Sequence, residues 1–318
     1  MVNSVMSASA PVAVIDLGSN SILLLVLGRG DRVLRDEARI TRLGQGVFES
    51  GVLAPQALAG TRRVIHEFAG IARELGARRL VGVGTEALRR ARDGERLLSE
   101  LCSEGLLDEA YLLNEQQEAE FAIAASRRTH AAGRSPLVVV DVGGGSTELA
   151  WEDAEGRVRA ASLPLGSVRL TEAHVRSHPI GPREMADLRD AVDRSSAGLE
   201  SERARDLRGD GNVIAVAGTA TTLAALELRL DPYAPEAVEG LPLSRETLSR
   251  WIADLSQLSV AERRRLPGLE PGRADVIVAG LVVLEGVLER LGAERFRVSG
   301  RGVRYGVAFR LLEADSPV

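Results

Sequence analysis

A weak internal repeat is the feature that most limits how this chain can fold. The segment Val12–Val26 (VAVIDLGSNSILLLV) consists of an apolar run, an Asp, a Gly, a turn of small residues, a Ser and a second apolar run, and Leu137–Trp151 (LVVVDVGGGSTELAW) has the same order. Each copy is typical of a β-hairpin whose tight turn carries an acidic residue at its mouth. The aligned positions are Asp16 with Asp141, Gly18 with Gly143, and Ser21 with Ser146.

The segments that follow each hairpin also correspond. Each copy is expected to continue with a third strand, a long helix, a short buried strand that ends in Gly-Thr, and another helix. This β-β-β-α-β-α order, present twice, predicts two α/β domains that face each other across a cleft, with the two acidic turns opposite one another. The expected third strands are 32–41 and 157–163, the long helices are 55–75 and 182 to about 207, and the Gly-Thr pairs are Gly84-Thr85 and Gly218-Thr219.

The length of 318 residues suits two such domains. The best boundary is the segment Thr129–Pro136 (THAAGRSP), which gives an N-terminal domain over 1–130 and a C-terminal domain over 131–301. The second half is the longer one, and its extra helices are expected between about Ser244 and Leu291.

Composition excludes several classes of protein. All 40 basic residues are arginine, so the chain can neither hold a Walker A loop nor form a Schiff base. The formal net charge of −5 argues against a nucleic-acid partner. The chain lacks both an apolar run long enough for a membrane span and the basic start of a signal peptide. The single cysteine, Cys102, follows an apolar run, so we expect a buried core thiol in a reducing, cytoplasmic compartment.

The second acidic turn, Asp141–Glu148 (DVGGGSTE), has the composition of a phosphate-binding loop. Its glycines let the backbone approach a bulky anion and point N–H groups at it, and the Ser146 hydroxyl adds a donor. Asp141 and Glu148 would repel phosphate unless a hard cation lies between them, and Mg²⁺ fits that role. A Gly-rich hairpin without a ligand is the alternative. The predicted phosphate-binding residues here are Gly143, Gly144, Gly145 and Ser146.

The first turn, Asp16–Ser21 (DLGSNS), has a similar composition to the second turn but contains less glycine. Ser19, Asn20 and Ser21 can donate hydrogen bonds to phosphate oxygens, and Asp16 is a third candidate metal ligand. Taken alone, the segment is an ordinary hairpin turn. Together with the second turn, it predicts a two-sided phosphate clamp.

Two strand-to-helix turns add candidates for anion binding. Thr85 begins a helix, whose N-terminus suits an anion, and Arg89 one turn further offers a planar guanidinium. Gly218 and Thr219 lie in a turn of small residues that permits a ligand to come close. The alternatives are a solvated helix arginine at Arg89 and close helix–strand packing at the second turn.

Other polar clusters carry weaker signals. Asn114–Glu120 is an acidic helix start, which the helix dipole alone would favour. Arg301 and Arg304 follow a glycine turn and face either the cleft or solvent. The run Arg263–Arg265 is expected to form a solvated face. Four histidines show no metal-ligand spacing and are expected to be structural or superficial: His66, His130, His174 and His178.

Taken together, the motifs resemble the Ppx/GppA phosphatase family, the exopolyphosphatases and guanosine pentaphosphate phosphohydrolases. The resemblance runs in the family's order from Val12 to about Arg310, and the length matches the family's short form. It implies a duplicated actin-like, sugar-kinase-like (RNase H-like) ATPase fold, with the terminal helix at 302–318 packing on the first domain. The segments that carry the resemblance are AVIDLGSNSILLLV, GVGTEALRRA, VVVDVGGGSTELA, LPLGSVRLTE, AVAGTATTLAAL and VSGRGVRYGVA.

The resemblance also assigns roles. The family's water-activating carboxylate falls on Glu118, and its cleft arginine falls on Arg89. Its essential acidic pair in the second turn falls on Asp141 and Glu148, which supports a Mg²⁺ cofactor. The chain departs from the family pattern at four positions. The family has Gly where this chain has Glu115, Glu where it has Gln117, and often acidic residues where it has Gly300 and Tyr305.

The activity implied is Mg²⁺-dependent hydrolysis of the terminal phosphoanhydride of inorganic polyphosphate. Alternatives are hydrolysis of guanosine pentaphosphate (pppGpp) at the same site, a phosphate-binding sensor with little turnover, and a kinase. Relatives of the short form imply a homodimer, and no nucleic-acid or membrane partner is expected. Because the chain is acidic overall, a polyphosphate channel requires a local cluster of arginines, for which the candidates are Arg39, Arg42, Arg89, Arg90, Arg92 and Arg304.

Overall fold

The computed structural model describes residues 10–130, 137–153, 155–199 and 213–313. The chain forms two compact units. Unit 1 consists of Met1–Phe121 together with Val303–Val318, and unit 2 consists of Ala122–Gly302. The division between the units lies inside a helix, whereas the expected boundary segment lies largely in 131–136, outside the described residues.

Unit 1 is built on a five-stranded sheet in the order β3-β2-β1-β4-β5. β1 and β2 form the expected hairpin and β3 extends it antiparallel, whereas β4 and β5 run parallel to β1. The strands are β1 (Val12–Leu17), β2 (Ser21–Leu27), β3 (Val33–Ile40), β4 (Arg79–Gly84) and β5 (Glu109–Leu112). The helices are α1 (Val47–Ser50), α2 (Pro55–Glu74), α3 (Glu86–Arg90), α4 (Gly94–Ser103), α14 (Val303–Glu313) and the first part of α5 (Glu115–His130), which continues into unit 2.

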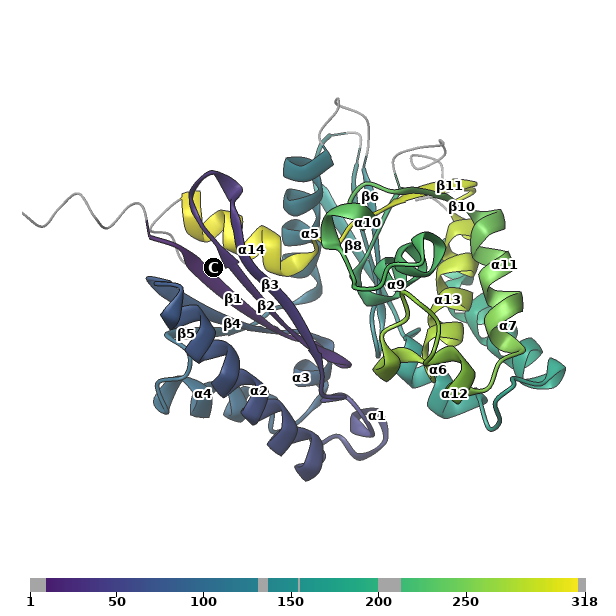
Figure 1. Cartoon of the computed structure of the whole chain (residues 1–318), viewed down its shortest axis with the longest axis horizontal. Coiled ribbons are helices and arrows are strands. Elements are labelled where there is room, and N and C mark those ends of the chain that lie inside the picture. Colours follow the sequence, from purple (N-terminus) through teal and green to yellow (C-terminus); the bar gives the residue numbers. More distant parts are fainter. Residues whose placement is uncertain (1–9, 131–136, 154, 200–212, 314–318) are drawn as a thin grey trace, which may run out of the picture. The chain divides into compact units, whose positions relative to one another are not determined.

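The alternation of side chains along β1 decides which residues reach the site. Ile15 and Leu17 face a core that is shared with α2, and half-buried Cys102 packs against that core. Val14 and Asp16 therefore point to the opposite face of the sheet, because neighbouring residues of a strand alternate. Figure 1 shows α14 lying along β1 and β2, which it packs against.

Unit 2 repeats this topology with one strand added. Its sheet has the order β10-β11-β9-β6-β7-β8, in which β6, β7, β8, β9 and β11 correspond to the five strands of unit 1. The strands are β6 (Val138–Val142), β7 (Thr147–Glu152), β8 (Val158–Leu163), β9 (Val213–Val216), β10 (Pro242–Ser244) and β11 (Arg295–Val298). The helices are α6 (Ser167–His174), α7 (Pro182–Ser196), α9 (Ala217–Leu228), α10 (Pro235–Val238), α11 (Arg245–Ser256), α12 (Val260–Arg263) and α13 (Ile277–Arg290).

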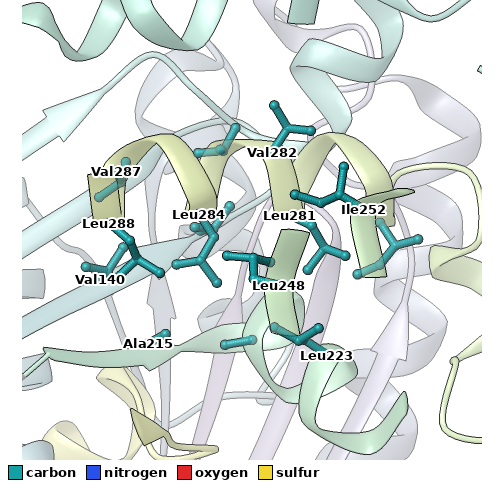
Figure 2. Close-up of a cluster of buried hydrophobic side chains, with 14 of the residues drawn as sticks. Val140, Ala215, Leu223, Leu248, Ile252, Leu281, Val282, Leu284, Val287 and Leu288 are labelled. Atoms are coloured by element: carbon teal, nitrogen blue, oxygen red, sulfur yellow. The ribbon is translucent and has the colours of Figure 1, made fainter. Parts of the chain in front are cut away.

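The core of unit 2 is organised around α13. This helix is apolar on nearly all sides, and Figure 2 shows its Leu281 near Leu248 of α11 and its Leu288 near Val140 of β6. Within the described ranges, no helix is long and apolar enough to cross a membrane. The expected duplication and the extra helices of the second half are confirmed.

Two expectations about local structure were wrong. The helix expected from 182 to about 207 ends at Ser196, and residues 200–212 lie outside the described ranges. Arg263 is not part of a solvated face but is fully buried. Its Nε donates to the Leu255 carbonyl (2.8 Å) and its Nη1 to the Ala274 carbonyl (3.0 Å), so it ties the end of α11 to the turn before α13. Periodicity exposes Arg264 and Arg265 but turns Arg263 inward.

Candidate active site

The turn between β1 and β2 has its carbonyls engaged on one side. The Asn20 carbonyl accepts the N–H groups of residues 41 and 42 (3.1 and 2.9 Å), and the Ser19 carbonyl accepts the N–H of Gly44 (2.7 Å). A side chain at Gly44 does not fit, because a Cβ there would lie 2.8 Å from the Ser19 Cβ. The segment after β3 therefore braces the turn from its carbonyl side.

The corresponding turn of unit 2 is braced in the same way by the start of α6. The Gly143 carbonyl accepts the N–H of Ser167 (3.0 Å), and the Gly144 carbonyl accepts the N–H groups of residues 168 and 169 (2.9 and 3.0 Å). A Cβ at Gly166 would lie only 2.3 Å from the Gly144 oxygen. Within the described residues, the N–H groups of Gly144 and Gly145 have no acceptor. A glycine turn whose carbonyls are occupied and whose N–H groups are available can bind an anion.

Two side chains at the first turn are buried without a partner. Asn20 is only 6% exposed, and neither its amide nitrogen nor its amide oxygen has a hydrogen bond within the described structure. Oδ1 of Asp16 is also buried and unpartnered. Because buried polar groups in native proteins are nearly always satisfied, these atoms point to a ligand at this turn.

The neighbours of Asp16 explain its electrostatics. The strand register places Leu23 and Ala38 beside Asp16 in one row across β1, β2 and β3. Burial among such groups raises the pKa of Asp16 to about 6, and the nearby Arg304 guanidinium limits the rise. A cation at Asp16 would restore its charged form.

The matching row of unit 2 is polar. Asp141, Glu148 and Ser162 lie side by side across β6, β7 and β8, and the Ser162 hydroxyl is 3.4 Å from Oε1 of Glu148. The Ser146 hydroxyl also donates to that Glu148 oxygen. Two adjacent carboxylates repel each other unless a cation or a proton joins them. Among the described residues, no three His, Cys, Asp or Glu side chains form a complete metal cluster.

The two residues predicted to act in catalysis are brought together in unit 1. Glu118 lies in the first turn of α5, is 6% exposed, and forms an ion pair with Nη1 of Arg89 from α3. The same nitrogen donates to the Leu113 carbonyl at the end of β5 (2.6 Å). Arg89 is therefore held beside Glu118 and does not stand alone as a solvated helix arginine.

Gln117 forms part of the cap of α5. The Asn114 Oδ1 accepts the Gln117 N–H (2.9 Å), and the Gln117 Oε1 accepts the Asn114 N–H (3.0 Å). This reciprocal pair is a capping box, in which Gln and Glu are equivalent. The departure from the family pattern at this position therefore leaves the local structure that presents Glu118 intact.

The strand-to-helix turns differ in what they offer a ligand. Thr85 is the N-cap of α3 and its side chain makes no capping bond. In unit 2, the Thr219 hydroxyl donates to the Val142 carbonyl (3.0 Å), so only its lone pairs remain for a ligand. Gly218 is covered by the Arg273 guanidinium, which lies where a Cβ would be. Sequence reasoning missed Arg273, whose only signal is an arginine in the Pro-Gly turn before an apolar helix.

Most of the arginines expected to line a polyphosphate channel are paired with acids. Nη2 of Arg304 donates to both carboxylate oxygens of Asp36 (2.9 and 3.0 Å), and the Tyr305 hydroxyl donates to the same carboxylate (2.7 Å). Sequence reasoning missed this use of Asp36 and Tyr305. The ion pairs in this set are Arg39–Glu37, Arg39–Glu67, Arg89–Glu118, Arg90–Glu86 and Arg304–Asp36.

Comparison with known proteins identifies the family of this chain. The sequence profile of the Ppx/GppA phosphatase family matches residues 27–315. The chain belongs to the Ppx/GppA phosphatase family. Exopolyphosphatase 2 of Mycobacterium tuberculosis is 33% identical over 94% of this chain and 98% of that protein. The guanosine-5'-triphosphate,3'-diphosphate pyrophosphatase of Aeromonas hydrophila is 29% identical over 94% of this chain and 59% of that protein.

A solved structure extends the agreement to the fold. The crystal structure of the Aquifex aeolicus member of the Ppx/GppA family is 30% identical, covers 97% of this chain and 99% of that chain, and aligns with a TM-score of 0.77. Membership of the Ppx/GppA family and the duplicated actin-like fold, both expected from the sequence, are therefore confirmed.

Proposed function

We propose that this protein is an exopolyphosphatase, which hydrolyses the terminal phosphoanhydride of inorganic polyphosphate and releases orthophosphate. The observation that carries the proposal is the pair of braced turns, each with its carbonyls engaged and donor groups left for an anion. Membership of the Ppx/GppA family and the name of the 33% identical relative support the same reaction class.

The roles of the residues follow from their chemistry. The turns at Ser19–Ser21 and Gly143–Ser146 each bind phosphate oxygens. Glu118 accepts a proton from the attacking water, and Arg89 holds the Glu118 carboxylate in place. Phosphoryl transfer depends mainly on positioning and electrostatic stabilisation, which these groups supply.

The residues present fit a hard divalent cation such as Mg²⁺. Asp141 and Glu148 are adjacent carboxylates, and Asp16 has a buried oxygen without a partner. Carboxylate oxygens are the ligands that Mg²⁺ prefers, and it normally takes one or two of them and keeps several waters. When bound, the cation would neutralise charge on the phosphate oxygens.

The test of the proposal is phosphate release from long-chain polyphosphate, with Mg²⁺ or with EDTA. We expect Glu118→Gln to lower kcat roughly 10²–10⁴-fold, the usual contribution of a general base, while substrate binding is retained. Glu120→Gln is the matched control, because Glu120 is an exposed carboxylate on the same helix that only accepts from Gln116 (2.9 Å). Equal activity of the Glu118 variant and the wild type would refute the assignment.

Hydrolysis of pppGpp at the same site is the second candidate function. The name of the Aeromonas hydrophila relative, which is 29% identical, favours it. The two substrates are distinguished by salt, because binding of a long polyanion releases many counterions and weakens steeply as salt rises. A flat salt response of KM, with pppGpp the better substrate, would identify the nucleotide phosphatase.

We also propose that the protein acts as a homodimer in the cytoplasm. The dimer follows from the resemblance to short-form relatives, and the single cysteine fits a reducing compartment. Light scattering coupled to gel filtration tests the oligomeric state, and fractionation of cells tests the compartment.

A further inference from the structure

Helix α5 is shared between the two units. The chain passes from one unit to the other at Phe121–Ala122, within α5, and again at Gly302–Val303, just before α14. The first turn of α5 carries Glu118 in unit 1, and its last turn lies in unit 2. Because α5 is one continuous helix, the contacts of its last turn restrain the helix that carries Glu118.

The last turn of α5 contacts two carboxylates of unit 2. Nε of Arg127 donates to Oε1 of Glu152 on β7 (3.2 Å). Nε2 of His130 lies 2.8 Å from Oε1 of Glu239, the C-cap residue of α10.

The second connection between the units is attached to the same carboxylate. The Ser299 hydroxyl donates to Oε1 of Glu239 (2.7 Å), and the Gly300 N–H donates to its Oε2 (3.0 Å). The Ser299 oxygen in turn accepts the N–H of Arg301 (3.0 Å), whose guanidinium Nε is 4.0 Å from Glu239. Glu239 therefore contacts both connections, one through His130 and one through Ser299 and Gly300.

The environment of Glu239 keeps it in its charged form. Burial alone would raise its pKa, but the close contact with His130 and the hydrogen bonds from Ser299 and the Gly300 N–H outweigh burial and lower it. The Glu239 side chain is only 18% exposed, so water has little access to the carboxylate and its contacts are made mainly with protein groups. A buried carboxylate that accepts hydrogen bonds from one chain segment and contacts a second within 2.8 Å restrains both of them.

We propose that Glu239 is a positioning residue that sets the placement of Glu118 through α5; this inference rests on the proposed hydrolase function. The helix rises 1.5 Å per residue, so Glu118 lies about 18 Å from His130, and a tilt of about 3° at the C-terminal end moves it by about 1 Å. A misplacement of that size can cost on the order of 10²-fold in rate. Glu239 also holds the segment that leads into α14, which carries Arg304.

The test compares Glu239→Gln with a matched control, Glu227→Gln. Glu227 accepts from Arg250 (2.6 Å) and Trp251 (2.7 Å), so it is a similarly bonded carboxylate, but it joins only α9 and α11 within unit 2. We expect Glu239→Gln to lower kcat about 10-fold or more, with KM changed less than about three-fold, as for a displaced catalytic group. At a similar loss of Tm, Glu227→Gln should keep the wild-type kcat. An unchanged kcat in Glu239→Gln would overturn the proposal.

A second measurement does not depend on activity. Hydrogen exchange of the two connections, residues 127–130 and 299–302, should rise in Glu239→Gln, and so should exchange of the first turn of α5, residues 115–121. Glu227→Gln should leave all three segments unchanged. Faster exchange that stops short of residues 115–121 would overturn the inference. Absence of phosphate release from the wild type would instead refute the proposed function, and the exchange data would still decide whether Glu239 couples the connections to α5.

Discussion

Replacing Asp16 with Asn should stabilise unit 1 at neutral pH while removing a residue proposed to bind the metal. Oδ1 of Asp16 is buried without a partner, and the carboxyl is flanked by Leu23 and Ala38. Its pKa is raised from 3.8 to about 6, so the native state binds the proton more tightly than the unfolded chain does. At pH values above about 6, the native protein holds an ionised carboxylate in a site that favours the neutral form.

The sign and size of the effect follow from this shift. Below about pH 3 the carboxyl is protonated in both states, so the variant and the wild type differ only by the small cost of the amide. As pH rises from about 4 to above 6, the free energy of unfolding of the wild type falls by up to about 3 kcal/mol relative to that of the variant. Each unit of pKa shift corresponds to about 1.36 kcal/mol. Roughly two-thirds of the change falls between pH 4.5 and 7.5.

The assay is urea denaturation in EDTA, read by pulse-labelling hydrogen exchange of residues 12–27, which reports on unit 1 separately. The stability advantage of Asp16→Asn should grow with pH and level off above about pH 7. Asp187→Asn removes an exposed carboxylate of unit 2 and should leave the urea midpoint of unit 1 unchanged at every pH. Parallel curves for the wild type and Asp16→Asn would refute the reasoning, because they would show that Asp16 has the same proton affinity folded and unfolded.

Two further predictions concern the elements that hold the site. Gln117→Glu should leave kcat within about two-fold, because either side chain completes the capping box, whereas Asn114→Ala should cost about 1 kcal/mol of stability in thermal denaturation and lower kcat as the first turn of α5 loosens. Gly166→Ala should weaken phosphate binding, measured by calorimetry, because a Cβ there would push the glycine turn of unit 2 away from its brace. Gly60→Ala in α2 is its control, because a Cβ at Gly60 meets nothing within 4 Å. This variant should stabilise the protein by roughly 0.5–1 kcal/mol and leave phosphate binding unchanged.

The fold could be predicted because its signals are local and occur twice. Hairpins with acidic turns, buried strands that end in Gly-Thr, and long amphipathic helices each have a periodicity that is readable in one sequence. The length of α7 was overestimated because the polar pattern continues past Ser196, where the helix gives way to a single turn of 3-10 helix. Gly198, two residues beyond Ser196, is the local signal that the helix ends there.

The candidate site was predictable where a motif carries it, and hidden where distant segments supply the contacts. Asp36 and Tyr305 are 269 residues apart, and nothing near either one indicates that they share a hydrogen bond. Arg263 stands in a run of three arginines, so its burial depends on the carbonyls of Leu255 and Ala274, which become acceptors only after the helices have packed. Sequence reasoning finds residues that belong to a pattern and misses residues that are defined by their neighbours.

The two copies of the repeated unit differ in chemistry at corresponding positions. The row across the first three strands reads Asp16, Leu23 and Ala38 in unit 1, but Asp141, Glu148 and Ser162 in unit 2. The apolar row raises the pKa of its single carboxyl, whereas the polar row places a second carboxylate and a hydroxyl beside the first. The helices that follow the last shared strand diverge as well, since the first turn of α5 carries Glu118 and the first turn of α14 carries Arg304. Equivalent positions on these helices thus hold opposite charges, and only the unit 1 helix supplies a carboxylate that could act as the proposed base.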